Sequence, residues 1–238
     1  MNMIDKNMFR DQWEASYKRG ENAIFYPKEE IVKFLNRFVR KKISFDEFID
    51  RIDFSREVKG LDYGCGMGRQ TVLLKEFGIN AYGIDISKNA IEQAKKLAGI
   101  LGHKQIENNF LVVDGQEVPF KDDFFNLTIV DGVLDSLTFE VARKIIKEID
   151  RVTTQLVFMS LISGDDDKHH KEFNGEEIVQ SQHENSTVQS YYNWNKIQRL
   201  IQGTGFKVEW CHLVTAESVI SRYKNGRYFL VLKKKNLI

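Results

Sequence analysis

The stretch Leu61-Asp62-Tyr63-Gly64-Cys65-Gly66-Met67-Gly68 joins a short apolar run to a helical pattern over 71–77. An aspartate ends the run, and three glycines alternate with other residues before the helix begins. Because glycine has no Cβ, such a turn can bend sharply and approach a ligand closely. In open α/β sheets, ligands bind beyond the carboxyl ends of the strands, where this turn would lie. The stretch therefore predicts a ligand-binding turn between a strand and a helix.

The sequence on either side of this turn alternates between strands and helices. Helical patterns cover 71–77, 91–101 and 139–152, and further apolar runs end at Asp85, Asp114 and Asp131. Strands that alternate with helices form right-handed βαβ units, in which helices cover both faces of a parallel sheet. We therefore predict an α/β fold with a doubly wound, mostly parallel sheet. Four aspartates, including Asp62, would lie at the same edge of that sheet.

The two ends of the chain predict additions to this core. Residues 1–57 are predicted to form a helical N-terminal cap, with a helix after Pro27 and a second helix after the capping-box pattern at 44–47. Near the C-terminus, strands over 206–214 and 226–232 flank an Asn-Gly pair, which is typical of a tight reversal. The last strand is therefore predicted to be antiparallel. Residues 58–238 would form the main domain.

Residues 163–190 interrupt the alternation with a long polar segment. Segments of this length are usually either functional lids or disordered. We expect residues 163–190 to form a substrate-side insertion or lid that orders over the binding pocket and helps to select the substrate, without contributing to the fold.

Composition excludes several classes of protein. With 42% hydrophobic residues the chain can form a core, and 35 basic against 34 acidic residues give no global attraction to nucleic acid. The basic run at 37–42 has acidic neighbours and is interpreted as a solvated face. Two cysteines cannot form a disulfide framework or a four-cysteine zinc site, and no metal site is predicted. The sequence contains neither a secretion signal nor a membrane-spanning run, so we expect a soluble, cytoplasmic protein.

A dinucleotide such as NAD is the first alternative for the glycine-rich turn. Its fingerprint, G-x-G-x-x-G, requires a third glycine where this chain has Arg69. The carboxylate of Asp62 would also repel a pyrophosphate. The pattern favours a nucleoside with a positively charged tail.

Taken together, these features resemble the class I S-adenosylmethionine-dependent methyltransferases. The glycine motif matches Asp62 to Gly68, and Tyr82-Gly83-Ile84-Asp85-Ile86-Ser87 and Val113-Asp114-Gly115-Gln116 match the next two strand ends. The resemblance implies a seven-stranded sheet, an acid at Asp85 on the ribose hydroxyls, and adenine contacts at 114–115. It also implies that N-terminal aromatic residues cover the methionine end of the cofactor. The implied cofactor-binding residues are Tyr17, Tyr26, Asp62, Gly64, Cys65, Gly66, Gly68, Asp85, Ile86, Asp114, Gly115, Asp131 and Gly132.

The resemblance leaves the methyl acceptor open. Base- and glutamine-directed relatives usually carry an Asn/Asp-Pro-Pro-aromatic motif where this chain has Asp131-Gly132-Val133-Leu134. We therefore expect a small-molecule acceptor, with a hydroxyl of a sugar or surface-glycan precursor as one possibility. A methyltransferase acting on RNA or protein and a NAD-type oxidoreductase are the alternatives. The sequence does not define the oligomeric state.

Two residues are predicted to act on the acceptor. Asp135 follows the fourth strand and could accept a proton from a hydroxyl, although it could equally cap the next helix. His183 lies in the polar segment, and histidine is the usual base near neutral pH. An exposed polar loop can also carry histidines without a functional role.

Overall fold

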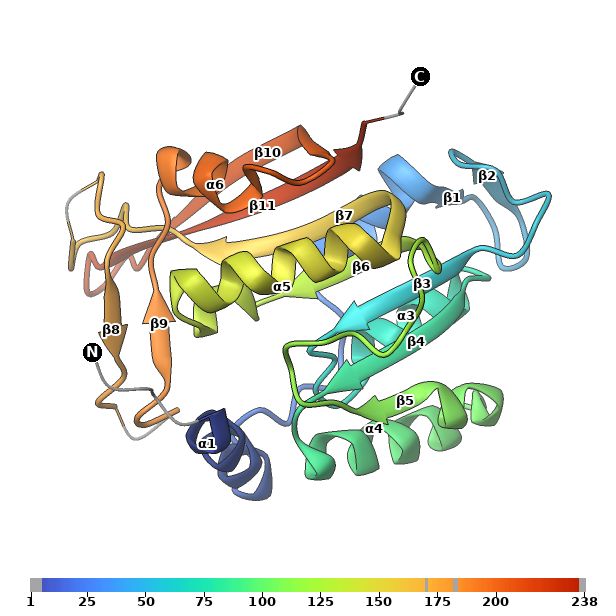
Figure 1. Ribbon diagram of the computed structural model, residues 1–238, viewed down its shortest axis with the longest axis horizontal. Coiled ribbons are helices and arrows are strands. Elements are labelled where there is room, and N and C mark those ends of the chain that lie inside the picture. The colour runs from blue at the N-terminus through green and yellow to red at the C-terminus, as the bar shows by residue number, and fades with distance from the viewer. Residues whose placement is uncertain (1–5, 170, 182–183, 236–238) are drawn as a thin grey trace.

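The computed structural model describes residues 6–169, 171–181 and 184–235, and its centre is a seven-stranded sheet (Figure 1). The strand order is β10-β11-β7-β6-β3-β4-β5. The strands are β3 (Lys59–Tyr63), β4 (Asn80–Asp85), β5 (Phe110–Val112), β6 (Phe125–Asp131), β7 (Thr153–Ile162), β10 (Phe206–Glu217) and β11 (Lys224–Lys234).

The strand directions confirm the prediction of a mostly parallel sheet. Strands β3 to β7 pair in parallel, whereas β11 runs antiparallel to both β7 and β10. The chain builds outward from β3 to β4 and β5, then returns to place β6 on the other side of β3. This reversal leaves a crevice beyond the carboxyl ends of β3 and β6, where open sheets bind their ligands.

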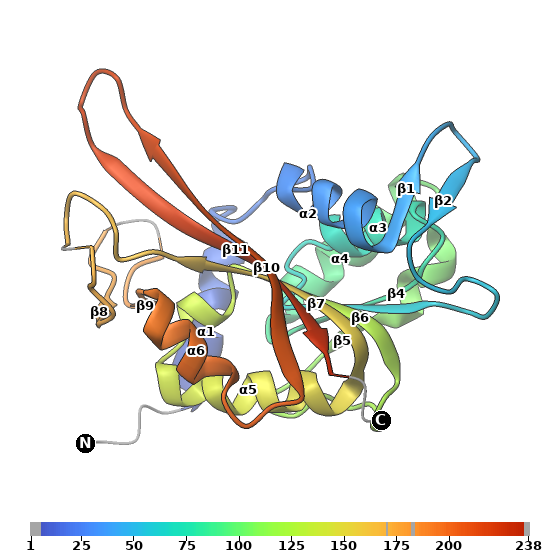
Figure 2. The same ribbon diagram turned by 90° about the horizontal axis from the view of Figure 1, so that it is seen from above.

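Helices cover both faces of the sheet, also as predicted (Figure 2). On one face, α5 (Phe139–Val152) and α6 (Trp194–Ile201) bury Ile146 and Leu200 in the larger apolar cluster. On the other face, α3 (Arg69–Glu76) buries Leu74 against the sheet, and α4 (Lys88–Ile100) packs beside α3. Two short 3₁₀ segments, η2 (Lys104–Asn109) and η3 (Leu134–Ser136), complete this part of the fold.

The N-terminal segment is only partly helical. It forms α1 (Lys6–Lys18), α2 (Glu29–Phe34) and the π-helical turn η1 (Leu35–Val39). The second helix predicted after 44–47 is wrong, because β1 (Arg40–Lys42) and β2 (Phe48–Asp50) form an antiparallel hairpin there. The capping-box residues lie in the connection, where Ile43 donates a backbone hydrogen bond to Glu47. A local signal for a helix start is thus overridden by strand pairing.

The polar segment 163–190 forms a second hairpin, made of β8 (Glu176–Ile178) and β9 (Val188–Ser190). It is attached to the body of the protein through the buried Lys196 of α6. The ammonium group of Lys196 donates to the carbonyl of Asn174 at 2.8 Å, and to the Ser190 hydroxyl and the Tyr191 carbonyl, both at 2.9 Å. The segment is therefore built into the fold at its base, and the expectation that it does not contribute to the fold is wrong.

The C-terminal hairpin is longer than predicted. Strand pairing continues to Glu217 and Lys224, so Asn225 and Gly226 belong to β11 and the reversal falls at 218–223. The Asn-Gly pair does not make the turn, because both residues pair with β10. The free end of the hairpin projects beyond the rest of the sheet in Figure 2.

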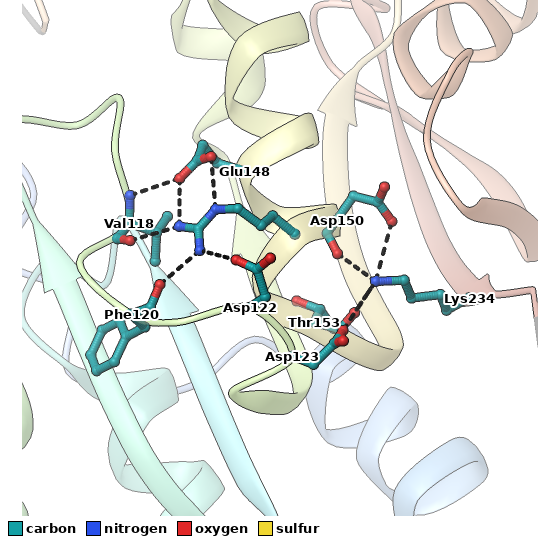
Figure 3. A network of polar contacts seen from close by, with 9 residues as sticks. Val118, Phe120, Asp122, Asp123, Glu148, Asp150, Thr153 and Lys234 are labelled. Carbon is teal, nitrogen blue, oxygen red and sulfur yellow. Dashed lines mark hydrogen bonds and ion pairs between the residues drawn. The ribbon is translucent and has the colours of Figure 1, made fainter.

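At the opposite edge of the sheet from the crevice, a polar network joins the start of β7 to the neighbouring segments (Figure 3). Arg151 donates to the carbonyls of Val118 and Phe120 and pairs with Glu148 at 2.8 Å. Nearby, Lys234 donates to the carbonyl of Thr153 at 2.9 Å. This network joins the chain before β6 to α5 and to the end of β11, and leaves the crevice edge free for ligand binding.

Gly68 begins α3 with φ +80°, and a Cβ there would lie 2.8 Å from the Cβ of Ala94 and 2.9 Å from the ring of Phe110. We predict that Gly68→Ala lowers the free energy of unfolding in urea by about 1–3 kcal/mol more than Gly102→Ala. Gly102 is the matched control because it has the same φ and no atom within 4 Å of its Cβ position. Equal losses in the two variants would show that close packing at Gly68 is unimportant.

Candidate functional site

A cavity of about 430 Å³ opens at the carboxyl ends of β3, β4 and β6. Cavities of this size hold small ligands. Eleven of the thirteen residues proposed for cofactor binding line it. They are Tyr17, Asp62, Gly64, Cys65, Gly66, Asp85, Ile86, Asp114, Gly115, Asp131 and Gly132.

The glycine-rich turn is held tightly against its neighbours. Gly64 and Gly66 have φ values of +70° and +52°, a region that favours glycine. A Cβ on Gly64 would lie 2.4 Å from the Val133 side chain, and a Cβ on Gly66 would lie 2.6 Å from the Tyr17 hydroxyl. The turn therefore brings bare backbone to the cavity wall.

Asp85 fixes the position of this turn. One carboxylate oxygen accepts a hydrogen bond from the Gly66 N–H and the other from the Ser87 N–H, both at 2.9 Å. Ser87 in turn caps α4 by accepting from the Ala90 N–H. Burial raises the pKa of Asp85, while these backbone donors oppose the shift. The carboxylate is thus a buried acceptor at the junction of the turn and α4.

Asp62 lies beneath the same turn and is almost fully buried. It accepts a hydrogen bond from the Thr71 hydroxyl at 2.7 Å. Burial raises the pKa of Asp62 to about 7; the Thr71 bond and Arg69 lower it, and the charge of Asp131 raises it. A cation bound in the cavity would favour the ionised carboxylate.

We predict that binding of S-adenosylhomocysteine, whose ammonium group is a cation, weakens about tenfold between pH 8 and pH 6 as Asp62 takes up a proton. In the unliganded protein, the raised pKa of Asp62 makes the folded state more stable at low pH than at high pH. The folded state holds the proton more tightly than the unfolded state, so stability falls as the pH rises from about 4 to 7. Calorimetric titrations at both pH values test the first effect. Asp62→Asn should remove it, and an unchanged pH dependence in that variant would contradict the assignment.

Asp131 connects the two ends of the cavity. It pairs with Lys28 at 2.8 Å and with Arg69 at 3.7 Å, and it accepts from the Ser160 hydroxyl at 2.7 Å. Ser160 also accepts from the guanidinium of Arg227 at 3.2 Å. A continuous chain of charged and polar groups therefore runs from the start of α3 across β6 and β7 to β11.

Asp135 lies at the far end of this chain and is 1% exposed. Its Oδ2 accepts from the Ile162 N–H at 2.9 Å and from Arg227 at 2.8 Å. Its Oδ1 is also buried, and it has no hydrogen-bond partner among the residues that the structure describes. Asp135 thus does not act as a helix cap here, and one carboxylate oxygen is left for a ligand.

Three of the sequence-predicted residues do not line the cavity or cannot be placed. Tyr26 is 84% exposed. Its backbone carbonyl accepts a hydrogen bond from the Arg69 guanidinium at 2.9 Å. Gly68 packs against α4 and β5, outside the cavity lining. His183 lies outside the described residues. Tyr26 and Gly68 therefore do not line this cavity, and their contact with the cofactor stays a prediction.

Several lining residues were not identified from the sequence. Lys28, Arg69, Gln70 and Arg227 all contribute to the cavity. Arg69 and Gln70 directly follow the glycine motif, a position that could have indicated them. Arg227 reaches the cavity only through the pairing of β11 with β7, which the sequence alone does not define.

Both apolar and polar side chains line the cavity together with Asp135. From the segment 163–190, strand β9 and the residues just before it line the cavity, and Glu184 is one of these residues. The apolar lining residues here are Val133, Leu137, Val141, Ile145, Ile162, Val179 and Val188.

Two further features bear on the kind of site. The described part of the chain contains no group of three or more histidine, cysteine, aspartate or glutamate side chains arranged to hold a metal ion. Over the same residues, no helix has both the length and the apolar character needed to cross a lipid bilayer.

Comparison with known proteins identifies the family. Residues 54–205 match the family described as a methyltransferase domain, which is more than half of the chain. The protein therefore belongs to this methyltransferase family. Its fold, with the β3–β6 crevice and glycine-rich turn, is the Rossmann-like fold of class I methyltransferases.

The individual relatives are similar to this chain only at low sequence identity and over part of its length. A sterol 4-C-methyltransferase of Caenorhabditis elegans is 27% identical over 127 residues, 52% of this chain and 37% of the relative. The alignments span less than half the length of the curated relatives that the chain matches.

Two solved structures share the fold over nearly the whole chain. The magnesium protoporphyrin IX methyltransferase of Synechocystis, with bound S-adenosylhomocysteine, has a TM-score of 0.64 at 17% identity, covering 97% of this chain and 100% of that one. The 1,6-didemethyltoxoflavin N1-methyltransferase of Burkholderia thailandensis has a TM-score of 0.67 at 12% identity, covering 99% and 93%.

Proposed function

We propose that this protein transfers a methyl group from S-adenosylmethionine to a small-molecule acceptor. The observation that carries the proposal is a single cavity that joins the Asp85-held glycine turn to the partly unpaired carboxylate of Asp135. A small acceptor is supported by two structural neighbours, methyltransferases of magnesium protoporphyrin IX and of 1,6-didemethyltoxoflavin, and by one relative, a sterol methyltransferase. A cytoplasmic location remains the expectation from the sequence.

The cavity fits the cofactor at its glycine end. Bare backbone at Gly64 and Gly66 lets the ligand approach closely, and Asp85 is positioned to accept hydrogen bonds from the ribose hydroxyls. Asp114 and Gly115 would contact the adenine from the end of β5. When bound, S-adenosylmethionine supplies a methyl group on a positively charged sulfur, a carbon already activated for displacement.

At the other end, Asp135 would act on the acceptor. Arg227 and the Ile162 N–H hold Oδ2 of Asp135, which fixes the carboxylate and offsets its charge. Oδ1 is then available to accept the proton of an acceptor O–H or N–H group as the methyl group is transferred. The enzyme also aligns the acceptor with the methyl group, which contributes several kcal/mol in such reactions.

The apolar residues of the cavity wall support a particular kind of acceptor. Leu137, Ile162 and Val188 surround the region of Asp135 with apolar side chains. They favour an acceptor with an apolar body and one O–H or N–H group over a sugar, which would leave several hydroxyls without partners. The segment 163–190 forms part of these walls, and we propose that it helps to select the acceptor.

A macromolecular acceptor has less support. In the basic stretch 37–42, Arg40 pairs with Asp50 at 2.5 Å and packs over the rings of Phe48 and Phe54. In Figure 1 its elements, η1 and β1, lie at the other end of the molecule from α1 and the β8–β9 hairpin, which line the cavity. These arginine and lysine side chains therefore do not form a track that leads to the site.

Incubation with S-adenosylmethionine labelled in its methyl group tests the proposed reaction. The acceptor panel would contain phenols, heteroaromatic amines, sterols, sugar nucleotides and RNA. We expect label transfer to apolar phenols or amines, with stoichiometric release of S-adenosylhomocysteine. Transfer to RNA alone, or to no class in the panel, would contradict the proposal.

A further inference from the structure

Arg227 of β11 lines the cavity with only part of its guanidinium group in use. Its Nη1 donates to the Asp135 carboxylate at 2.8 Å and lies 3.2 Å from the Ser160 hydroxyl oxygen. The structure records no hydrogen bond from its Nε or Nη2 to any of the residues that it describes. In a guanidinium group, the Nε–H and one Nη2–H are parallel and match the two oxygens of a carboxylate. Arg227 therefore has a carboxylate-binding edge free.

The neighbours of Arg227 hold this edge in place before a ligand binds. Asp135 also accepts from the Ile162 N–H at 2.9 Å, and the Ser160 hydroxyl also donates to Asp131 at 2.7 Å. Both groups are thus fixed by other elements and contact the same nitrogen of Arg227. The side chain of Arg227 is 29% exposed. An acceptor that fills the cavity would remove water from the free edge, which is unfavourable unless the acceptor itself supplies the missing oxygens.

The charges around Arg227 leave one positive charge in excess. Lys28 pairs with Asp131 at 2.8 Å, and Arg69 lies 3.7 Å from the same carboxylate. Arg227 pairs with Asp135 at 2.8 Å. Three cations therefore share two carboxylates at this end of the cavity. One negative charge on the acceptor would balance the group.

The other carboxylates of the cavity contact different groups. Asp85 and Asp62 hold the glycine-rich turn and the start of α3, and Asp114 follows β5. Glu184 lies toward α1, where its backbone N–H donates to the Glu21 carboxylate at 3.4 Å. These carboxylates therefore belong to the cofactor end and to the α1 side of the cavity.

We propose that Arg227 selects an acceptor that carries a carboxylate on an apolar body. The proposal rests on the proposed function. Nε and Nη2 of Arg227 would bind the two carboxylate oxygens, and Oδ1 of Asp135 would accept from the O–H or N–H group that is methylated. Because Arg227 and Asp135 contact each other, both groups of the acceptor must lie on one small body. A hydroxy- or amino-substituted aryl carboxylate meets these conditions.

Paired acceptors that differ only at the carboxylate test the proposal. The panel contains the hydroxybenzoates, aminobenzoates and hydroxynaphthoates, each with its methyl ester, and methyl-labelled S-adenosylmethionine reports transfer. For the acid that reacts best, we expect kcat/KM to exceed that of its ester by about tenfold or more, since charge-assisted hydrogen bonds to Arg227 are lost in the ester. The label should resist mild alkali, because a methyl ether or methylamine is stable there whereas a methyl ester is hydrolysed.

Three variants separate recognition of the carboxylate from support of Asp135. Arg227→Met removes the guanidinium group and also releases Asp135, so kcat/KM should fall for acid and ester alike. The informative readout is their ratio, which should fall to less than threefold. Arg227→Lys keeps the charge without the paired N–H groups and should give an intermediate ratio. Lys28→Met removes another cation of the same group and should change the ratio less than threefold. If Arg227→Met does not fold, as judged by urea denaturation, the wild-type pairs and Arg227→Lys decide the outcome.

Contrary results would be distinguishable. An ester that reacts as well as its acid in wild type, or transfer to neutral acceptors alone, would overturn the role of Arg227 and leave the proposed function intact. So would an acid preference that survives in Arg227→Met or that falls equally in Lys28→Met. An alkali-labile product would show that the carboxylate itself is methylated, which also overturns the proposal. Failure of the wild type to bind S-adenosylhomocysteine in calorimetry, or to methylate any acceptor, would overturn the proposed function itself.

Discussion

Asp135→Asn is expected to lower kcat by about 10²–10⁴-fold, the usual range for loss of a general base. The substitution keeps an oxygen that can accept from the Ile162 N–H, but an amide cannot take the proton of the acceptor. Affinity for S-adenosylhomocysteine should change less than threefold, because Asp135 lies at the proposed acceptor end of the cavity. The measurement is steady-state turnover with the acceptor found in the labelled-methyl panel.

Ser136→Ala provides the matched control. Ser136 also lines the cavity, but its hydroxyl donates to the Gly132 carbonyl at 3.2 Å and is not needed for proton transfer. We expect less than a fivefold change in kcat. If Asp135→Asn behaves like this control, the acceptor is methylated without a base at this position, and Asp135 serves only to hold Arg227 and the start of the 163–190 segment.

Asp85→Ala is expected to weaken binding of S-adenosylhomocysteine by 100-fold or more. Hydrogen bonds to a charged group contribute roughly 1.5–3 kcal/mol each, and both ribose hydroxyls would be affected. The free energy of unfolding should also fall by about 1–3 kcal/mol, because the N–H groups of Gly66 and Ser87 lose their acceptor. Calorimetry and urea denaturation measure the two effects separately.

The conservative variant Asp85→Asn distinguishes ligand binding from support of the turn. Asparagine retains one oxygen for a backbone donor, so it should recover much of the stability but little of the affinity. Recovery of both in parallel would mean that Asp85 supports the turn and does not contact the cofactor. Stability that falls without any loss of affinity would have the same meaning.

The core of the fold could be predicted because its signals are local. The bounds of the helix Phe139–Val152 were predicted correctly from its apolar spacing. The glycine motif by itself places Asp62 and Gly66 close together, because the two residues are separated by only one short turn. The cavity between these elements then follows from the rules for open sheets.

What could not be predicted depends on contacts distant in sequence. The hairpin at 40–50 replaced a helix because strand pairing outweighed a capping pattern. Arg227 lies opposite Ile162 only through the register of β11, and Gln70 differs from an ordinary polar helix residue only by being buried. The sequence also does not show that the side chain of Tyr26, an aromatic residue in the expected covering segment, is exposed.

Titration of the wild-type protein with S-adenosylhomocysteine and, separately, with NAD tests the central claim most directly. The cavity presents Asp62 and Asp85 next to the glycine turn, and Arg69 occupies the position of the third glycine of a dinucleotide site. We expect saturable binding of one S-adenosylhomocysteine per chain and no heat of binding with NAD. Saturable binding of NAD with no response to S-adenosylhomocysteine would contradict the assignment of this cavity to methyl transfer.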